Sequence, residues 1–276
     1  MSGLFSSKRL RWFAAAIVIL NGVFPALWIL FTSLKTEGEL TQKPITYWPH
    51  EPTVANFISA FQDQPLLTFL TNSLIVAGLS TLLSLFISAL AAYAIARLRL
   101  RFRGLILTAI IGVSMFPLVT LMVPLFEIMR SLGLLNSYWA LVLPYTVLNL
   151  PICTLMMVSF FQDIPRDIEN AAMLDGYTRL SALWRIVLPL AAPGVATAAI
   201  LAFVNSWDEF LLALSMNSAV AYRTLPVGIQ LYQGEFAFPW PIISAALVVA
   251  IVPIVVLIVI FQEKVVSGLT SGGLKG

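Results

Sequence analysis

The chain has 276 residues, of which 59% are hydrophobic and only 11% are charged, and its mean hydropathy is +0.93. Soluble domains carry about a quarter charged residues, so this composition excludes an ordinary soluble domain and indicates a membrane protein. The net charge of +3 is not by itself a sign of nucleic-acid binding, and we expect no nucleic-acid partner.

Six stretches of the chain contain no Asp, Glu, Lys or Arg, and each is 22 to 32 residues long. They occupy 12–34, 66–96, 104–126, 131–162, 186–207 and 236–262. About 20 apolar residues cross the hydrocarbon core as a helix, and none of the stretches alternates as a strand does. The sequence therefore predicts an all-α membrane protein with six transmembrane helices. The first stretch exceeds the apolar region of a signal peptide, so we interpret it as an uncleaved span.

The basic residues are distributed unevenly between the two sides of the membrane. When the connecting segments are assigned alternately, 12 of the 16 Lys and Arg residues fall on the side of the N-terminus. The positive-inside rule then predicts that both termini are cytoplasmic. The basic stretch 97–103, RLRLRFR, becomes the short loop between the second and third spans, and a nucleic-acid patch is the alternative interpretation.

Small side chains recur every four residues in the second stretch, at Ser80, Ser84, Ser88, Ala92 and Ala96. Such a stripe allows close approach of another helix. Two interpretations are open: an interface with a partner subunit, or packing within this chain.

A polar segment, ENAAMLDG at 169–176, separates the fourth stretch from the fifth. Pro165 suits the first turn of a helix, acidic residues at 167 and 169 favour its N-terminal end, and Gly176 favours its end. A second helix is expected beyond the glycine, because Leu180, Leu183, Trp184 and Val187 fall on one face. The pair of helices either docks into a groove of a partner protein or lies on lipid headgroups.

The polar segment resembles the cytoplasmic loop signature of binding-protein-dependent ABC importer permeases. That pattern is E-A-A-x-x-D-G, nine further residues, and I-x-L-P. The matching residues are Ala171, Ala172, Asp175, Gly176, Ile186, Leu188 and Pro189. The resemblance implies a type I ABC importer permease fold, a single permease domain over 1–276, and a coupling loop at 162–190 that docks on an ATPase subunit. Its implied ATPase-coupling residues are Glu169, Asn170, Ala171, Ala172, Met173, Leu174, Asp175 and Gly176.

One residue of the signature departs from the pattern, because Asn170 stands where the glutamate is usual and Glu169 precedes it. An ion pair made by the usual glutamate is therefore in doubt. Glu169 is a candidate to replace it, although neighbouring residues on a helix point about 100° apart.

The resemblance extends to nearly the whole chain. The segments WILFTSLK at 28–35, NSWDEFLLAL at 205–214, TLPVGIQ at 224–230 and VSGLTSGGLKG at 266–276 resemble the carbohydrate-uptake branch, specifically the second permease of maltose-type transporters. The resemblance implies that the tail, 264–276, contacts the ATPase subunits through Ser271, Gly272, Gly273, Leu274 and Lys275. It also implies that the segment 217–240 contacts the solute-binding protein, whereas an aromatic belt at the membrane interface is the alternative for Phe238 and Trp240.

A polar cluster within the fifth stretch comprises Asn205, Trp207, Asp208 and Glu209. Ionisable residues inside a membrane usually face a cavity or a partner. One hypothesis is that this cluster lines the sugar path, with carboxylates accepting bonds from hydroxyls and Trp207 stacking on a sugar ring. The alternative is that Asp208 and Glu209 cap the end of this span or bond to a neighbouring helix.

Taken together, these features predict a permease subunit of an ATP-driven importer for an α-glucoside or oligosaccharide, in a bacterial or archaeal cytoplasmic membrane. The partners implied are a second homologous permease, two ABC ATPase subunits, an extracytoplasmic solute-binding protein, the sugar and membrane lipid. We expect no catalytic residue and no metal site, since His50 and Cys153 are single residues of their kinds and no phosphate-binding loop motif occurs. ATP and Mg belong to the ATPase subunits. The alternatives are an ion-coupled secondary transporter that uses Asp208 and Glu209, an importer permease for a solute other than sugar, and an intramembrane enzyme.

Overall fold

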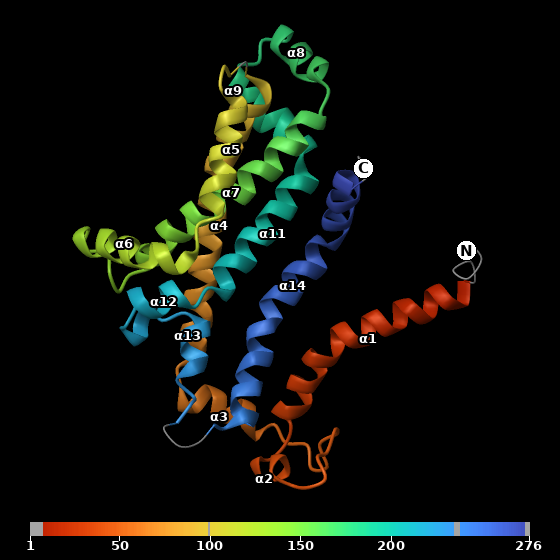
Figure 1. Ribbon diagram of the computed structural model, residues 1–276, viewed down its shortest axis with the longest axis vertical. Helices are drawn as coiled ribbons and strands as arrows, with labels where there is room; N and C mark the ends of the chain where they lie inside the picture. Colours follow the sequence, from red (N-terminus) through yellow and green to blue (C-terminus); the bar gives the residue numbers. More distant parts are fainter. Residues whose placement is uncertain (1–7, 99, 235–237, 274–276) are drawn as a thin grey trace. The chain divides into compact units, whose positions relative to one another are not determined.

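The computed structural model describes residues 8–98, 100–234 and 238–273, with the side chains of residues 8, 9 and 263–273 outside the description. Every regular element in this part of the chain is helical (Figure 1). The helices in chain order are α1 (Lys8–Ser33), α2 (Glu37–Leu40), α3 (Ala55–Asp63), α4 (Leu66–Arg97), α5 (Arg103–Ser114), α6 (Leu118–Ser131), α7 (Trp139–Asp163), α8 (Arg166–Leu174), α9 (Arg179–Ala182), the π-helical turn η1 (Leu183–Val187), α10 (Leu188–Leu190), α11 (Ala192–Asp208), α12 (Leu211–Met216), the 3-10 turn η2 (Val220–Tyr222), α13 (Leu225–Gln230) and α14 (Trp240–Gly273).

Four helices in the described part of the chain are long and apolar enough to cross a membrane, and they cover Leu10–Ser33, Leu66–Arg97, Trp139–Asp163 and Trp240–Gln262. Two further candidates are helix pairs that bend sharply, by 92° between α5 and α6 and by 83° between the segment Arg179–Leu190 (α9, η1 and α10) and α11. The number of spans is six if each bent pair counts as one. The third and fifth apolar stretches are thus broken helices rather than the continuous ones expected from the sequence.

Proline explains where both bends fall. Pro117 stands at the N-terminal cap of α6, and its backbone is extended, with φ −61° and ψ 130°. Pro189 and Pro193 flank Ala191, at which the second pair bends. Because proline lacks a backbone N–H and its ring clashes with the preceding turn, a helix cannot continue smoothly through these positions. The fourth stretch is also shortened, since Gly133 and Asn136 have positive φ angles and α7 begins only at Trp139.

The contacts divide the chain into two compact units, and each is described by itself. Unit 1 comprises Met1–Leu66 and Gly228–Val252, and unit 2 comprises Leu67–Val227 and Pro253–Gly276. Within unit 1, Asn56 on α3 donates hydrogen bonds to the carbonyls of Ser33 and Lys35, each at 2.8 Å. Tyr232 donates its hydroxyl hydrogen to the carbonyl of Ala60. These bonds fasten α3 to the end of α1 and to the segment after α13.

Unit 2 is built around α4, α7 and α11, which run between the end that carries α8 and the end that carries α12 (Figure 1). The small residues of α4 face inward: Ser80, Ser84 and Ser88 are fully buried. Ser84 donates to the carbonyl of Thr146 on α7 at 3.1 Å, and Ser80 donates to Ser206 on α11 at 3.0 Å. The stripe of small residues therefore packs within this chain, which favours the second of the two interpretations above.

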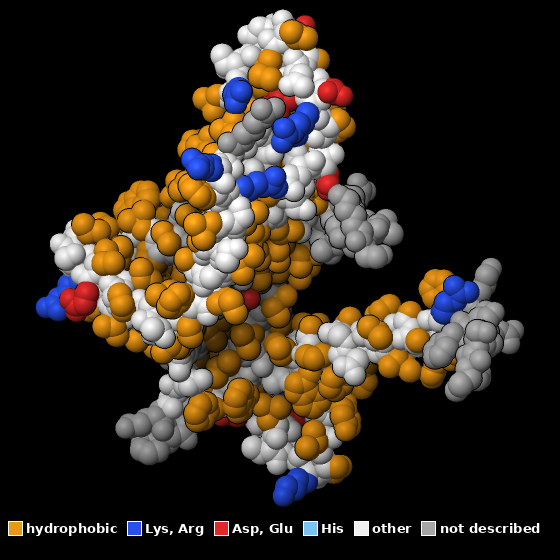
Figure 2. Space-filling view, turned by 45° about the horizontal axis from the view of Figure 1, so that its top comes forward, with side chains coloured by type: hydrophobic (Ala, Val, Ile, Leu, Met, Phe, Trp, Pro, Cys, Tyr) orange, Lys and Arg blue, Asp and Glu red, His pale blue; other side chains and the backbone are white. Residues whose placement is uncertain are grey.

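The approach of α11 to α7 depends on a glycine. A Cβ atom at Gly194 would lie 2.2 Å from the ring of Phe160, and real Cβ contacts are never so short. Gly194 therefore allows the start of α11 to lie directly against α7. On the face drawn in Figure 2, hydrophobic side chains cover much of the surface, and several Lys and Arg side chains gather toward the end of unit 2 that carries α8.

Candidate coupling and solute-contact sites

Helix α8 carries the segment with the loop signature. Pro165 occupies its N-cap position, and Asp167 and Glu169 lie in its first turn, where the partial positive charge of the helix end favours carboxylates. At the other end Gly176 has a φ of +90°. Its N–H donates to the carbonyl of Met173 at 3.2 Å, and the N–H of Tyr177 donates to the carbonyl of Ala172 at 3.1 Å. This pair of bonds is the Schellman arrangement that ends helices at glycine, so the expected helix and its glycine stop are confirmed.

The two faces of α8 have different surroundings. Glu169 and Ala172, each 6% exposed, form the inner face. Leu174 is 89% exposed, and Asn170, Ala171 and Asp175 are exposed with it. Ile168 is also 42% exposed, so the exposed part of α8 carries two large apolar side chains, of which Leu174 is the more prominent.

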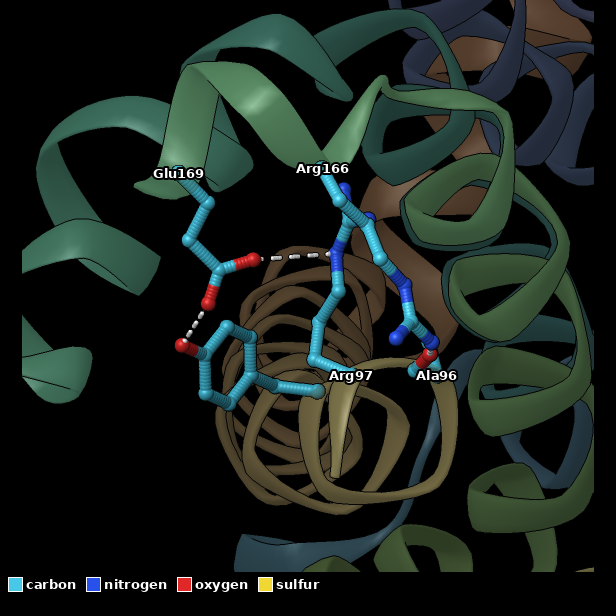
Figure 3. A network of polar contacts seen from close by, with 5 residues as sticks. Ala96, Arg97, Arg166 and Glu169 are labelled. Atoms are coloured by element: carbon cyan, nitrogen blue, oxygen red, sulfur yellow. Dashed lines mark hydrogen bonds and ion pairs between the residues drawn. The ribbon is translucent and has the colours of Figure 1, made fainter. Parts of the chain in front are cut away.

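Glu169 binds two residues in the last turns of α4 (Figure 3). Tyr93 donates its hydroxyl hydrogen to Glu169 Oε1, and Arg97 Nε lies 3.3 Å from Glu169 Oε2 as an ion pair. The side chains of Arg97 and Glu169 are only 3% and 8% exposed. We call this three-residue contact the α4–α8 clasp. Its carboxylate lies inside the chain, so Glu169 does not share the outward direction of Asn170.

A pocket of about 450 Å³ lies beside the clasp, lined by Arg97, Leu98, Arg166, Glu169, Asn170, Met173 and Arg179. Three of these seven residues are arginines and one is a glutamate. Arg166 Nη2 donates to the carbonyl of Ala96 at 3.5 Å (Figure 3). Within the described part of the chain, the buried Nη2 atom of Arg97 has no hydrogen-bond partner. The pocket that Asn170 borders therefore has more positive than negative side chains in its lining.

A second site lies where α6, α7 and α11 meet in unit 2. Its cavity, of about 260 Å³, is lined by Leu118, Tyr145, Leu148, Asn149, Asn205, Ser206 and Glu209. Asn149 donates to Ser206 Oγ at 2.9 Å, and Asn205 donates to Asn149 Oδ1 at 3.5 Å. Amide, hydroxyl and carboxylate groups thus line a cavity between largely apolar helices.

Glu209 has a structural role as well as a place in that cavity. It accepts hydrogen bonds from the backbone N–H groups of Leu212 at 2.9 Å and Ala213 at 3.2 Å, and so caps α12. Tyr145 on α7 donates to its Oε2 atom at 2.5 Å. Of the alternatives to a sugar contact, bonding to a neighbouring helix is therefore observed for Glu209, while the helix that it caps is α12 and not the fifth span.

The other residues of that polar cluster separate. Asn205 lines the cavity. Trp207 is only 3% exposed and stacks on Phe203, with ring centroids 5.5 Å apart. Its indole face is occupied within the chain, so the structure does not present it for stacking on a sugar. Asp208 is exposed at the end of α11 and is not part of the cavity lining.

Comparison with known proteins identifies the family. The family described as "Binding-protein-dependent transport system inner membrane component" matches residues 84–271. The chain belongs to this family. It is 72% identical over 276 residues, covering 100% of this chain and 97% of the relative, to the sulfoquinovosyl glycerol transport system permease protein SmoH of Agrobacterium fabrum. It is 37% identical to the trehalose/maltose transport system permease protein MalG of Thermococcus litoralis, covering 98% of each chain.

Solved structures support the fold. A chain of a bacterial ABC transporter involved in the import of alginate superposes with a TM-score of 0.78 at 22% sequence identity, over 95% of this chain and 99% of that one. The molecule is therefore a binding-protein-dependent permease with the ABC importer permease fold. As such it is a multi-pass subunit of the inner, or cytoplasmic, membrane and a transport component rather than an enzyme.

Sequence reasoning missed the three other polar residues of the permease's cavity, Tyr145, Asn149 and Ser206, as well as the apolar Leu118 and Leu148. The available signal was spacing, because Tyr145 and Asn149 stand four residues apart within an apolar stretch and so share one helix face. Ser206 is adjacent to the predicted Asn205 but lies on the buried side of α11.

The predicted contacts of the tail stay predictions. Ser271, Gly272 and Gly273 end α14 with their backbone described but not their side chains, and Leu274 and Lys275 lie outside the described residues. Among the described residues, no group of three or more His, Cys, Asp or Glu could hold a metal ion.

Proposed function

We propose that this permease imports a sugar as part of an ATP-driven transporter, with α8 docked on an ATPase subunit. The observation that supports this most is the division of α8 into a tethered face and a free one. Leu174 is 89% exposed, and an apolar side chain loses that unfavourable contact with water when a helix enters a groove of a partner. Asn170, Ala171 and Asp175 would complete the docking surface, while Glu169 and Ala172 face inward.

The proposed complex contains a second homologous permease, two ABC ATPase subunits and an extracytoplasmic solute-binding protein. ATP and Mg are held by the ATPase subunits. Closure of the ATPase dimer around ATP displaces α8, and the helices move from an inward-open to an outward-open arrangement. The binding protein then releases the sugar into the path, which includes the cavity at Asn205 and Glu209. The tail at 264–276 adds a contact with the ATPase subunits.

Six spans with both termini in the cytoplasm are part of the proposal. Each bent pair counts as one span, and 12 of the 16 basic residues then lie on the cytoplasmic side. This topology places α8 where an ATPase can reach it. The three arginines that line the pocket beside α8, Arg97, Arg166 and Arg179, agree with that side of the membrane.

The solute that we propose is an α-glycoside, and sulfoquinovosyl glycerol is the first to test. One relative is named for that compound and another for trehalose and maltose. The cavity supplies an amide at Asn205, a carboxylate at Glu209 and a phenol at Tyr145, which suit the hydroxyl groups of a sugar. None of its seven lining residues is Lys or Arg, so we expect sugar hydroxyls, and not a sulfonate, to face this cavity.

Cysteine crosslinking tests the docking of α8. The native Cys153 is buried, so the wild-type chain is the background control. In membranes containing the whole transporter, Leu174→Cys should crosslink to a cysteine in the groove of the ATPase subunit, whereas Ala172→Cys, on the inner face, should not. Equal yields at the two positions, or none at Leu174→Cys, would contradict the proposed docking.

Uptake by proteoliposomes tests the energy source. With ATP inside the vesicles and no ion gradient, solute delivered by the binding protein should accumulate. Accumulation that requires an ion gradient and ignores ATP would instead support the secondary transporter.

A further inference from the structure

Helix α8 has no continuous connection to its neighbours along the chain. Before it, Ile164 and Pro165 are extended, with ψ angles of 126° and 134°. After it, Gly176 has a φ of +90°. A nine-residue helix with non-helical links at both ends cannot transmit a push or a twist through its backbone alone. Its orientation therefore depends on contacts made by its side chains.

Three polar contacts of side chains on α8 meet at the C-terminal end of α4. Glu169 binds Tyr93 and Arg97, and Arg166 donates to the carbonyl of Ala96 (Figure 3). Tyr93 and Arg97 are four residues apart and so lie on one face of α4. Both side chains are buried. The hydrogen bond from Tyr93 to this buried carboxylate fixes direction more strictly than apolar packing, because hydrogen bonds to charged groups are short and directional. The ion pair with Arg97 adds the attraction of opposite charges.

Beyond the clasp, α4 is bonded along its length to the elements around the solute cavity. Ser84 bonds to the backbone of α7, and Ser80 bonds to Ser206, which lines the cavity. At its other end Asn72 donates to the carbonyls of Ala221 and Arg223, each at 2.9 Å. A contiguous series of hydrogen bonds therefore leads from α8 to the cavity and on to the segment before α13.

We propose that Glu169 is a positioning residue that joins α8 to α4, so that a displacement of the docked helix moves the helices around the cavity. This role rests on the proposed docking of α8, but it is separate from docking itself. The residues of the docking surface face outward, whereas the carboxylate of Glu169 faces Tyr93 and Arg97. Loss of the α4–α8 clasp should leave the ATPase bound and hydrolysing ATP, with less solute moved per ATP.

The test measures uptake and ATP hydrolysis in the same proteoliposomes, with the complete transporter and the binding protein. In Glu169→Gln we expect the ratio of solute to ATP to fall by about tenfold, in the usual range of coupling between sites, while crosslinking of Leu174→Cys to the ATPase stays at its wild-type yield. Asp167→Asn is the matched control, because it removes an exposed carboxylate from the same turn of α8 and should leave the ratio unchanged.

Two further variants keep the test decisive. The double variant Glu169→Arg with Arg97→Glu restores a pair of opposite charges, so it should recover much of the solute-to-ATP ratio that either single change loses. If the single changes only destabilised the protein, combining them would not recover the ratio. If Glu169→Gln fails to assemble, Tyr93→Phe removes a single hydroxyl group and should also lower the ratio. An unchanged ratio in Glu169→Gln or, failing that, in Tyr93→Phe would overturn the role of the clasp while leaving docking intact. If Leu174→Cys in an otherwise wild-type permease does not crosslink to the ATPase, the proposed docking itself is contradicted.

Discussion

Two glutamates of unit 2 make a useful comparison: Glu169, which is buried, and Glu209, which is half-buried. Glu169 and Glu209 each accept a hydrogen bond from a tyrosine on another helix, Tyr93 in one case and Tyr145 in the other. Their remaining partners differ. Glu169 is paired with the guanidinium of Arg97, whereas Glu209 caps α12 through two backbone N–H groups and borders a cavity.

The difference in partners suits the two glutamates to different roles. When both members of an ion pair are buried, removing either charge is strongly destabilising, because the remaining charge is neither paired nor solvated by water. Such a contact suits a joint between two helices. A carboxylate held by backbone N–H groups keeps part of its accepting capacity for another donor, and that suits a surface over which a hydroxylated solute passes.

Neutralising the two carboxylates should give the largest contrast. Glu169→Gln leaves Arg97 buried without a counter-charge, so we expect it to lower the free energy of unfolding by about 3 kcal/mol. Glu209→Gln keeps an acceptor for the α12 cap and should cost only about 1 kcal/mol. Denaturant titration of the purified permease complex measures both. Equal losses would mean that the clasp is no more charge-dependent than the cap.

Removing the tyrosine hydroxyls should give a smaller effect and separate the functions. Tyr93→Phe and Tyr145→Phe each delete one hydrogen bond to a carboxylate, with a loss of stability of about 1.5 kcal/mol. We expect Tyr93→Phe to lower the solute-to-ATP ratio, and Tyr145→Phe to raise the apparent KM for solute at an unchanged ratio. Paired uptake and ATPase assays decide. If Tyr93→Phe instead raised KM and Tyr145→Phe lowered the solute-to-ATP ratio, the roles proposed for the two sites would be exchanged.

The cavity can also be tested at its rim. Asn205→Ala removes an amide that lines the cavity, and the loss of one hydrogen bond of about 1 kcal/mol corresponds to a KM for solute about fivefold higher. Asn217→Ala is not a suitable control, because its side chain bonds the backbone of Ser137. Ser131→Ala, at an exposed position at the end of α6 and outside the cavity lining, should leave KM unchanged. Glu209→Ala and Glu209→Gln complete the series, and unchanged uptake in both would remove Glu209 from the solute path.

The smallest effect is expected at the residue that departs from the family's loop pattern. Asn170→Glu places a carboxylate on the rim of the pocket that three arginines line. Because the position is exposed, we expect a gain of less than about 1 kcal/mol in ATPase binding, which fades as salt rises. Binding measured at two salt concentrations tests this. A large, salt-independent change would mean that Asn170 lies in a desolvated part of the interface.

The sequence predicted helix α8 better than it predicted the lining of the cavity at Asn205 and Glu209. Pro165, the acidic first turn and Gly176 are local signals, and the structure has a helix from Arg166 to Leu174 that ends at this glycine. The stretch around Asn205 predicted a polar cluster, but not that only Asn205 and Glu209 of its four residues line the cavity. Trp207 stacks on Phe203 and Asp208 leaves the lining, while Tyr145 and Asn149 enter the cavity from α7, more than 50 residues away in the sequence.

The sequence by itself determined that the protein lies in a membrane, where its apolar stretches are, and the family to which the loop at 169–176 points. Each of these depends on local composition or on spacing within one helix. Only the tertiary structure decided the angles of the two bends, the inward direction of Glu169 and the identity of the residues around the cavity. The physical reason is that a side chain's partners depend on which helix packs against its own, and that packing is set by contacts between residues far apart in the chain.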